Sequence, residues 1–374
     1  MIYIHIPFCH RKCNYCAFYS LAGRQDKERY VDALCHEIEQ RSKGYGKPIK
    51  TLYLGGGTPT QLSIAQLTSL VETLRSCFDL SQIEEATIEC NPEDLSPSYL
   101  EALASLRLFN RISMGVQSFR DSDLATIGRI HTGLQARNAI ENAYMAGFHN
   151  ITIDLIYGLP NQTLDDWQVQ LQQLATLPIQ HLSCYALTVE PHTLLEQQIR
   201  KKLIQPATEA TAVAQYEILC QWAAAQGWEQ YEVSNFCKDH HYSRHNSRYW
   251  DRTPYLGFGA AAHSFDGLNR RWNYSNLRKY CEGIEQGRIY YEEEQLTLRD
   301  AFNEYMMTAL RTTRGIEKKI INTQFPNYTN YLAIHIQPYL QSNLLIETDS
   351  AYQPTSKGLL HADGIASELF ILEN

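Results

Sequence analysis

An alternation of β-rich runs with helical patterns constrains the fold of this 374-residue chain more than any other feature of its sequence. The predicted strands are 2–6, 51–54, 86–90, 111–116, 151–156 and 181–186, and the predicted helices are 27–42, 64–77, 97–105, 134–146, 164–175 and 208–225. Strands that alternate with helices form parallel sheets with right-handed crossovers. The sequence therefore predicts an α/β fold, and six such units favour a three-quarter parallel β/α barrel over a closed barrel of eight.

The chain after the sixth unit has a different pattern. Residues 230–271 read as loop-like and are rich in His, Tyr, Arg and Trp, which predicts an extension over the barrel. Short helices and a strand pair follow, at 302–311, 328–341, 344–347, 351–354, 356–361 and 365–371. These patterns resemble a small winged-helix-like module. We therefore predict a barrel over 1–229, an aromatic and His-rich extension covering it over 230–295, and a winged-helix-like domain over 296–374.

Charge and hydropathy exclude several classes of function. The formal net charge of −8 disfavours general binding to nucleic acid or to anionic membrane surfaces. No run of eighteen apolar residues occurs, and Met1 leads directly into a predicted strand, so we expect neither a membrane span nor a signal peptide. Seven of the ten cysteines are scattered along the chain, which is typical of reduced thiols rather than of a disulfide framework. A cytoplasmic location is expected.

The other three cysteines lie close together near the start of the chain. Cys9, Cys13 and Cys16 have C-x3-C-x2-C spacing. Four thiolates would close a four-iron cluster, so three at this spacing leave one iron free for an exchangeable ligand. Zinc is one alternative, since His5 and His10 are nearby and a zinc site needs a fourth ligand. The other alternative is a set of buried structural thiols.

Glycines and polar residues follow several of the predicted strands. Gly55, Gly56 and Gly57 come directly after the second strand, where they allow a ligand to approach the backbone closely. A tight turn is the alternative, and the absence of a following Lys disfavours a nucleotide triphosphate. Three polar side chains lie at later strand ends: Glu89, Gln117 and Asp154. Each alone could be structural, but the carboxyl ends of barrel strands share one mouth, so together they predict a binding site there.

The chain resembles the radical S-adenosylmethionine (SAM) superfamily in its cysteine trio, its glycine triplet and the residues Glu89, Gln117, Asp154 and Arg129. Within that superfamily it resembles the branch that contains oxygen-independent coproporphyrinogen III oxidase and the HemW family of haem chaperones. The resemblance covers almost the whole chain. It implies a [4Fe-4S] cluster on Cys9, Cys13 and Cys16, with the methionine end of SAM on the open iron. The SAM contacts that it implies are Tyr3, Tyr15, Gly56, Gly57, Thr58, Glu89, Gln117, Arg129, Asp154 and Ala186.

Within that branch, Gly56 and Glu89 are expected to hold the methionine amino group, and some of the other residues match contacts to a second SAM molecule in the oxidase. An electron from the reduced cluster would cleave SAM to a 5′-deoxyadenosyl radical, which requires an external electron donor. The number of SAM molecules and the use of radical chemistry stay open at this point.

Three features favour the chaperones over the oxidase. The oxidase carries a fourth cysteine two residues after the third, where this chain has Phe18, and it has a long segment before the Tyr that matches Tyr3. The run 245–250, His-Asn-Ser-Arg-Tyr-Trp, resembles the HNxxYW motif of the chaperones. Imidazole is a common axial ligand of haem, so His245 is the first candidate for haem contact. A structural histidine that anchors a loop is the alternative, and the rival ligands are His240, His241 and His263.

The predicted function is therefore a haem-binding chaperone with a radical SAM core that delivers haem to an unidentified acceptor protein. Contact with a membrane is expected only through that acceptor. One rival is coproporphyrinogen III oxidase itself, acting in porphyrin biosynthesis. The other rival is a radical SAM enzyme that acts on an unknown substrate, with the aromatic segment as its lid.

Overall fold

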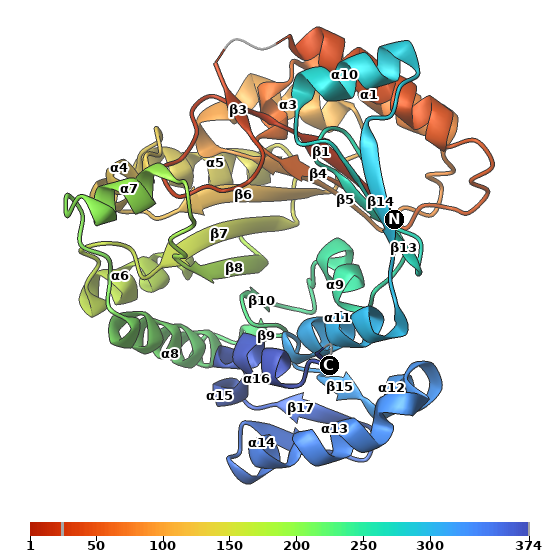
Figure 1. Ribbon diagram of the computed structural model, residues 1–374. Coiled ribbons are helices and arrows are strands. Elements are labelled where there is room, and N and C mark those ends of the chain that lie inside the picture. The colour runs from red at the N-terminus through yellow and green to blue at the C-terminus, as the bar shows by residue number, and fades with distance from the viewer. Residues whose placement is uncertain (24–25, 373–374) are drawn as a thin grey trace.

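The computed structural model describes residues 1–23 and 26–372, and its centre is a nine-stranded sheet in the order β11-β1-β4-β5-β6-β7-β8-β10-β9 (Figure 1). The strands are β1 (Ile2–Ile6), β4 (Thr51–Gly56), β5 (Glu85–Cys90), β6 (Arg111–Gln117), β7 (Ile151–Tyr157), β8 (His181–Ala186), β9 (Glu229–Gln230), β10 (Asn235–Cys237) and β11 (Leu256–Phe258). The seven strands from β11 to β8 run parallel, and β10 pairs antiparallel with β8 and β9.

The sheet curves into a barrel that stays open, because β11 and β9 are its two ends and do not pair with each other in the described residues. The crossover helices lie outside it: α1 (Lys27–Arg41), α2 (Ile64–Cys77), α3 (Pro97–Ser105), α5 (Gly133–Met145), α6 (Leu164–Leu174) and α8 (Glu209–Ala225). Ser63, Thr132 and Thr163 each begin a helix with a capping box, which satisfies backbone N–H groups of the first turn. The prediction of a partial parallel β/α barrel is confirmed.

Short elements at the ends of the strands were not predicted. They are β2 (Phe8–Cys9), β3 (Leu21–Ala22), α4 (Asp121–Ile127), α7 (Leu194–Arg200), and the 3-10 turns η1 (Pro59–Gln61) and η2 (Pro92–Asp94). Elements of two to seven residues are too short to give a clear periodic signal. All of them belong to the loops that surround the barrel mouth.

The segment 230–295 is more regular than its loop-like sequence indicates. It supplies β10 and β11, which extend the central sheet at opposite sides, and helix α9 (Arg244–Trp250) between them. Its second half forms an antiparallel sheet of β12 (His263–Phe265), β13 (Asn269–Asn273) and β14 (Tyr291–Gln295), with helix α10 (Leu277–Gln286). Strand pairing with residues far away in sequence, such as β11 with β1, leaves no periodic mark in such short runs. The domain boundaries stay a prediction.

The C-terminal residues form a small module with its own apolar core, built from Phe302, Met306 and Leu310 among others. Its elements are α11 (Leu298–Leu310), β15 (Ile316–Glu317), α12 (Lys318–Gln324), η3 (Pro326–Tyr328), α13 (Thr329–His335), α14 (Gln337–Gln341), β16 (Leu345–Glu347), β17 (Ala351–Pro354), α15 (Ser356–Leu360) and α16 (Ala362–Glu368). The sheet order β15-β17-β16 suits a winged-helix-like module. It lies beside β9, β10 and α9 (Figure 1), where Val233 N donates to Arg311 O at 2.8 Å. Across 1–23 and 26–372, no helix is long and apolar enough to cross a membrane.

Candidate cluster and cofactor site at the barrel mouth

The three N-terminal cysteines lie on a loop that crosses the mouth of the barrel. On one side, Thr58 N, just after β4, donates to Phe8 O at 2.7 Å. On the other side, Asn14 N donates to Ile127 O at the end of α4 at 2.9 Å, and Leu195 N of α7 donates to Asn14 O at 2.8 Å. Cys9 and Cys13 therefore lie between two fixed points of the backbone, and Cys16 follows the second of them by two residues. All three are half-buried.

Two polar side chains of the barrel contact the cysteine sulfurs. Thr58 Oγ1 donates to Cys9 Sγ at 3.6 Å, and Arg129 Nη1 donates to Cys13 Sγ at 3.5 Å. Hydrogen bonds and positive charge near sulfur favour the thiolate, which is the form that binds metal. Burial works in the other direction and raises the pKa of the Cys9 and Cys16 thiols in the metal-free chain. The positive iron ions of a bound cluster would lower the pKa of these thiols and favour the thiolate.

The surroundings of the thiols, within the described residues, do not supply the extra ligand that a zinc site needs. No group of three His, Cys, Asp or Glu side chains in the described part of the chain is close enough together to hold one metal ion. In a four-iron cluster each thiolate binds a different iron, so its ligands stand farther apart than those of zinc. His5 and His10, the proposed extra zinc ligands, are engaged elsewhere: His5 Nε2 bonds Tyr19 O at 2.9 Å, and His10 Nε2 bonds Asp94 Oδ1 at 3.0 Å.

The glycine triplet forms a cradle beside the loop. Gly56 has φ +108, and a Cβ atom there would lie 2.4 Å from the His5 ring, so only glycine fits. The backbone N–H of Gly56 donates to Glu89 Oε2 at 2.9 Å, and Tyr53 Oη donates to Glu89 Oε1 at 2.7 Å. Burial, reinforced by the charge of Asp154, raises the pKa of Glu89 to about 7. A carboxylate held in this way is suited to an ammonium group, whose charge would lower that pKa again.

Arg129 connects the cysteine loop to the strand ends. Its Nη2 donates to Asn91 Oδ1 at 2.7 Å and to Gly115 O at 2.6 Å, while Nη1 contacts Cys13. Its Nε is buried and finds no partner among the described residues. An orphaned buried donor of this kind is unusual in a folded protein and suggests that a ligand acceptor completes it. The donor set and the glycine cradle therefore fit a SAM molecule bound next to a cluster.

The remaining residues of the predicted SAM site are distributed around the same mouth. Gln117 ends β6 beside a register shift and has φ +67, a strained conformation that is common at functional sites. Asp154 lies in β7, and burial raises its pKa to about 6. Tyr3 Oη bonds His5 Nδ1 at 3.0 Å, and Ala186 is exposed at the end of β8. Tyr15 packs instead against the small apolar cluster of Ile127, Ile156 and Leu159.

A pocket of about 540 Å³ opens next to Gly56 and Glu89. Phe18 and His263 line it, and Phe18 is 72% exposed. Tyr3, Tyr19, Tyr249 and Tyr255 form much of the rest of its wall. An aromatic pocket next to the proposed SAM cradle is the first candidate for the binding site of a substrate or second ligand.

The structure does not bring His245 to any open surface, which corrects the first expectation for haem contact. His245 is 0% exposed, its Nδ1 bonds Thr51 Oγ1 at 3.1 Å, and its Nε2 bonds Tyr249 Oη at 3.3 Å. Burial lowers the pKa of His245 to about 3, so the ring is neutral. This geometry matches the alternative, in which the histidine anchors its segment. Neither ring nitrogen is free for haem.

Sequence reasoning missed two residues that organise this site. Tyr53 positions Glu89, and Asn91 bridges Arg129 to Thr58 Oγ1, to which its Nδ2 donates at 3.2 Å. A signal for both was present. Tyr53 lies two residues before Gly55, and alternate residues of a strand share one face, while Asn91 directly follows β5 at the barrel mouth.

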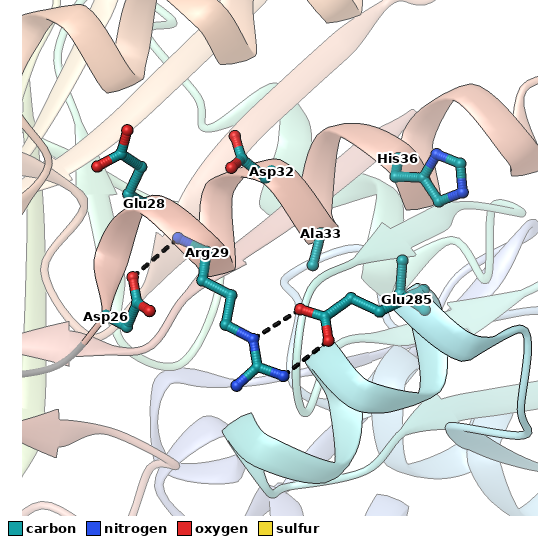
Figure 2. Close-up of a pocket in the computed structure, with 8 residues that line it drawn as sticks. Asp26, Glu28, Arg29, Asp32, Ala33, His36 and Glu285 are labelled. Atoms are coloured by element: carbon teal, nitrogen blue, oxygen red, sulfur yellow. Dashed lines mark hydrogen bonds and ion pairs between the residues drawn. The ribbon is translucent and has the colours of Figure 1, made fainter.

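A separate hollow of about 460 Å³ lies between α1 and α10 (Figure 2). Arg29, the guanidinium that faces it, already forms a bidentate pair with Glu285, with Nε–Oε1 2.6 Å and Nη2–Oε2 2.7 Å. Both side chains are well exposed, so the pair is a surface contact between two helices. We assign no ligand to this hollow.

Comparisons with known proteins agree with this geometry. The profile of the radical SAM superfamily matches residues 3–173. The chain is 35% identical to the haem chaperone HemW of Bacillus subtilis over 96% of each chain, and 31% identical to that of Escherichia coli over 100% of this chain and 98% of the relative. Among solved structures, coproporphyrinogen III oxidase (HemN) of Escherichia coli, a radical SAM enzyme, matches with a TM-score of 0.84 and 25% identity over 98% of this chain and 89% of its own. The chain thus belongs to the radical SAM superfamily and, within it, to the HemW family.

Proposed function

We propose that the protein is a haem chaperone built on a radical SAM core, which binds haem and passes it to an acceptor protein. The observation that carries this proposal is the similarity to HemW chaperones along nearly the whole chain: besides the two relatives above, HemW of Lactococcus lactis is 33% identical over 100% of this chain. A match that includes the C-terminal module and the segment 230–295 covers more than the shared barrel.

In this proposal the barrel mouth holds the two resident cofactors. Cys9, Cys13 and Cys16 bind a [4Fe-4S] cluster, and SAM binds beside it. Glu89 and the backbone at Gly56 receive the methionine amino group, and Arg129 offers its unpartnered Nε to an acceptor on SAM. Bound together, the cluster and SAM supply reductive cleavage of a sulfonium. The chain itself orients SAM.

The partners follow from this function. Haem, an acceptor protein and an electron donor for the cluster are expected, and nucleic acid is not, because the net charge is −8. The cytoplasm is the proposed compartment, since no cysteine of the described residues forms a disulfide and reduced cysteines persist in that compartment. A membrane is reached only through the acceptor.

Coproporphyrinogen III oxidase activity is the second candidate. The structural match to HemN of Escherichia coli at a TM-score of 0.84 favours it. Phe18, which stands where the oxidase is expected to carry its fourth cysteine, counts against it. In this structure Phe18 projects into the mouth pocket as an exposed apolar side chain.

One anaerobic experiment separates the two candidates. The full chain is reconstituted with iron and sulfide, given SAM and a reductant, and then offered coproporphyrinogen III and haem in parallel reactions. The chaperone proposal predicts a Soret band that stays with the protein through gel filtration and no sustained formation of protoporphyrinogen. Repeated turnover of coproporphyrinogen III would reject the chaperone in favour of the oxidase.

A further inference from the structure

A second large groove, of about 600 Å³, lies between the barrel and the C-terminal module. It shares no lining residue with the mouth pocket. Glu84, which immediately precedes β5, lines it, so the groove adjoins the end of the barrel where β5 begins, whereas the cysteine loop lies where the strands end. Thr312 and Arg314 of the C-terminal module form its far wall. Figure 1 shows this module beside β9 and α9.

Helix α9 presents two different faces to its surroundings. His245 and Tyr249 point into the barrel, where His245 packs against Tyr53 with ring centroids 5.1 Å apart. Arg244, Arg248 and Trp250 line the groove instead. The backbone N–H groups of Arg244 and His245 donate to Glu85 at 2.9 and 2.8 Å, which fixes the helix and therefore the rotation of both faces.

His240 lies in this groove with one ring nitrogen close to a carboxylate and the other without a partner in the described part of the chain, as in many metal-binding histidines. Its Nδ1 lies 3.4 Å from Glu229 Oε2 and 3.2 Å from Tyr242 Oη, and that hydroxyl donates to Glu229 at 2.7 Å. Histidines that bind metal commonly give the N–H of one ring nitrogen to a carboxylate, which orients the ring and makes the other nitrogen a better donor. His240 Nε2 has no hydrogen-bond partner in the described residues, and its side chain is 82% exposed.

The walls of the groove suit a flat ligand with carboxylate groups. Tyr231, Tyr242 and Trp250 contribute aromatic surface, and the Trp250 Nε1 donor is buried without a partner among the residues described. Arg244 and Arg248 share the single carboxylate of Glu84, at 3.0 and 3.9 Å. Arg314 pairs with Asp251, which also lines the groove, through Nη2. The three guanidinium groups therefore keep spare donors. Guanidinium groups bind carboxylates in bidentate geometry and stack on flat rings.

We propose that this groove is the haem seat of the protein, with His240 Nε2 as an axial iron ligand, Glu229 as the residue that positions it, and the arginines of α9 and of the C-terminal module receiving the propionates. This inference rests on the proposed function, because it takes haem as the ligand. It places haem in an open groove between two parts of the chain, away from the proposed SAM site. Such a position leaves the haem accessible to an acceptor protein.

The test is a haem titration of the full chain, comparing His240→Ala with His241→Ala. His241 is the matched control, since it is the adjacent histidine but bonds Lys238 O through Nδ1 and lines a different hollow. In wild type and His241→Ala, ferric haem should give the same Soret band and a histidine-ligand signature in resonance Raman and electron paramagnetic resonance spectra. In His240→Ala that signature should be lost, and haem affinity should fall at least tenfold.

Two more variants address the rest of the groove. Glu229→Gln should keep the histidine ligand but shift the iron–histidine stretching frequency, because a neutral amide polarises the imidazole less than a carboxylate does. Arg314→Ala, on the far wall, should weaken haem binding several-fold without changing the axial ligand. Circular dichroism and iron content, unchanged in each variant, show that the fold and the cluster are intact.

The outcomes distinguish this inference from the proposed function. If wild-type protein binds no haem, the chaperone proposal itself fails. If wild type binds haem and His240→Ala retains the full spectrum and affinity, the groove assignment is wrong while the chaperone proposal stands. Loss of the ligand in His263→Ala, with His240→Ala unchanged, would place haem in the mouth pocket instead.

Discussion

At the scale of single residues, the three N-terminal cysteines differ in their surroundings from the four cysteines that are buried. They are half-buried beside Arg129 and Thr58, whereas Cys90, Cys184, Cys237 and Cys281 are buried in the body of the protein. Burial raises the pKa of those four thiols, as it does for Cys9 and Cys16. What distinguishes the loop is that its three thiols lie close together in sequence beside the polar groups of Arg129 and Thr58. The ligands of the iron–sulfur cluster are therefore assigned to the loop.

Replacing one of these ligands should remove the cluster without unfolding the protein. Cys13→Ala leaves two thiolates, too few to hold a cubane, so iron and sulfide content and the visible absorbance should fall to background. Cys77→Ala, at the end of α2, is the matched control and should bind iron like wild type. Circular dichroism checks the fold. Unchanged iron content in Cys13→Ala would contradict the ligand assignment.

The raised pKa of Glu89 predicts a specific dependence of stability on pH. Its pKa is about 7 in the folded chain against 4.5 when exposed, so between these values the folded state holds a proton that the unfolded state releases. The stabilisation by this group is therefore complete below about pH 4.5 and is lost as pH rises through 7. The loss reaches about 3.5 kcal/mol, at about 1.4 kcal/mol per pKa unit.

Denaturant unfolding of wild type and Glu89→Gln without SAM measures this effect. The stability of wild type relative to the variant should decline from pH 4.5 to pH 7.5, because the amide cannot ionise. Glu101→Gln, at an exposed position of α3, serves as control and should show no such trend. With SAM added, wild-type affinity should increase over the same pH range and that of Glu89→Gln should not. A flat difference across pH would show that Glu89 is not desolvated.

At the scale of elements, the glycine cradle at the end of β4 depends on the absence of a Cβ atom at Gly56. Gly56→Ala should abolish SAM binding and destabilise the fold, because the new Cβ meets His5 at 2.4 Å as well as adopting φ +108. Gly147→Ala is the matched control. Gly147 has a similar φ of +95, but a Cβ atom there would meet no other atom within 4 Å. The substitution should therefore lower the free energy of unfolding only by the backbone strain of about 1–2 kcal/mol and leave SAM affinity unchanged. Equal SAM affinity in both variants would contradict the cradle.

Helix α9 is expected to depend on His245 for its attachment. His245→Ala removes a fully buried ring that contacts Tyr53 and Thr51, which should lower the free energy of unfolding by about 2–4 kcal/mol. Asn246→Ala, the next residue on the same helix, should change it by no more than about 0.5 kcal/mol. Haem binding at saturating protein should survive in both variants. A stable His245→Ala variant that has lost only its haem would restore His245 as the ligand.

The sequence predicted the long elements of the barrel well and the short ones poorly. Strands β1 and β8 and helices α2 and α3 have the predicted bounds, because five or more residues of regular pattern define them. Strand β11 and helix α9 were missed or misread, because their stability comes from distant partners. β11 pairs with β1, and α9 binds Glu85, about 160 positions away.

The same distinction applies to the site. Glu89 and Gln117 were predicted because they lie at the carboxyl ends of parallel strands, which share one mouth. Asp154 was predicted on the same argument, but it lies in the middle of β7 rather than at its end. The burial of His245 could not be predicted, since the pattern of α9 alone does not show which of its faces meets the barrel. Tyr53 and Asn91 were missed because their importance comes from what they contact, Glu89 and Arg129.

At the scale of the whole molecule, the open side of the barrel is completed by the segment that follows it. β10 and β9 extend the sheet at one end and β11 at the other, while α9 contacts β4 within the opening. The C-terminal module then attaches through Tyr231 and Val233, to which residues of the module are hydrogen-bonded. The mouth and the groove are thus parts of one framework, one at each end of β5.

The central claim is that three cysteines hold a four-iron cluster with one open iron, and Mössbauer spectroscopy of anaerobically reconstituted, 57Fe-labelled protein tests it most directly. The account predicts four irons per chain, three of them alike and one distinct, with only the distinct iron changing its isomer shift when SAM is added. Four equivalent irons whose isomer shifts do not change when SAM is added would contradict it, as would a sample that contains zinc and no iron.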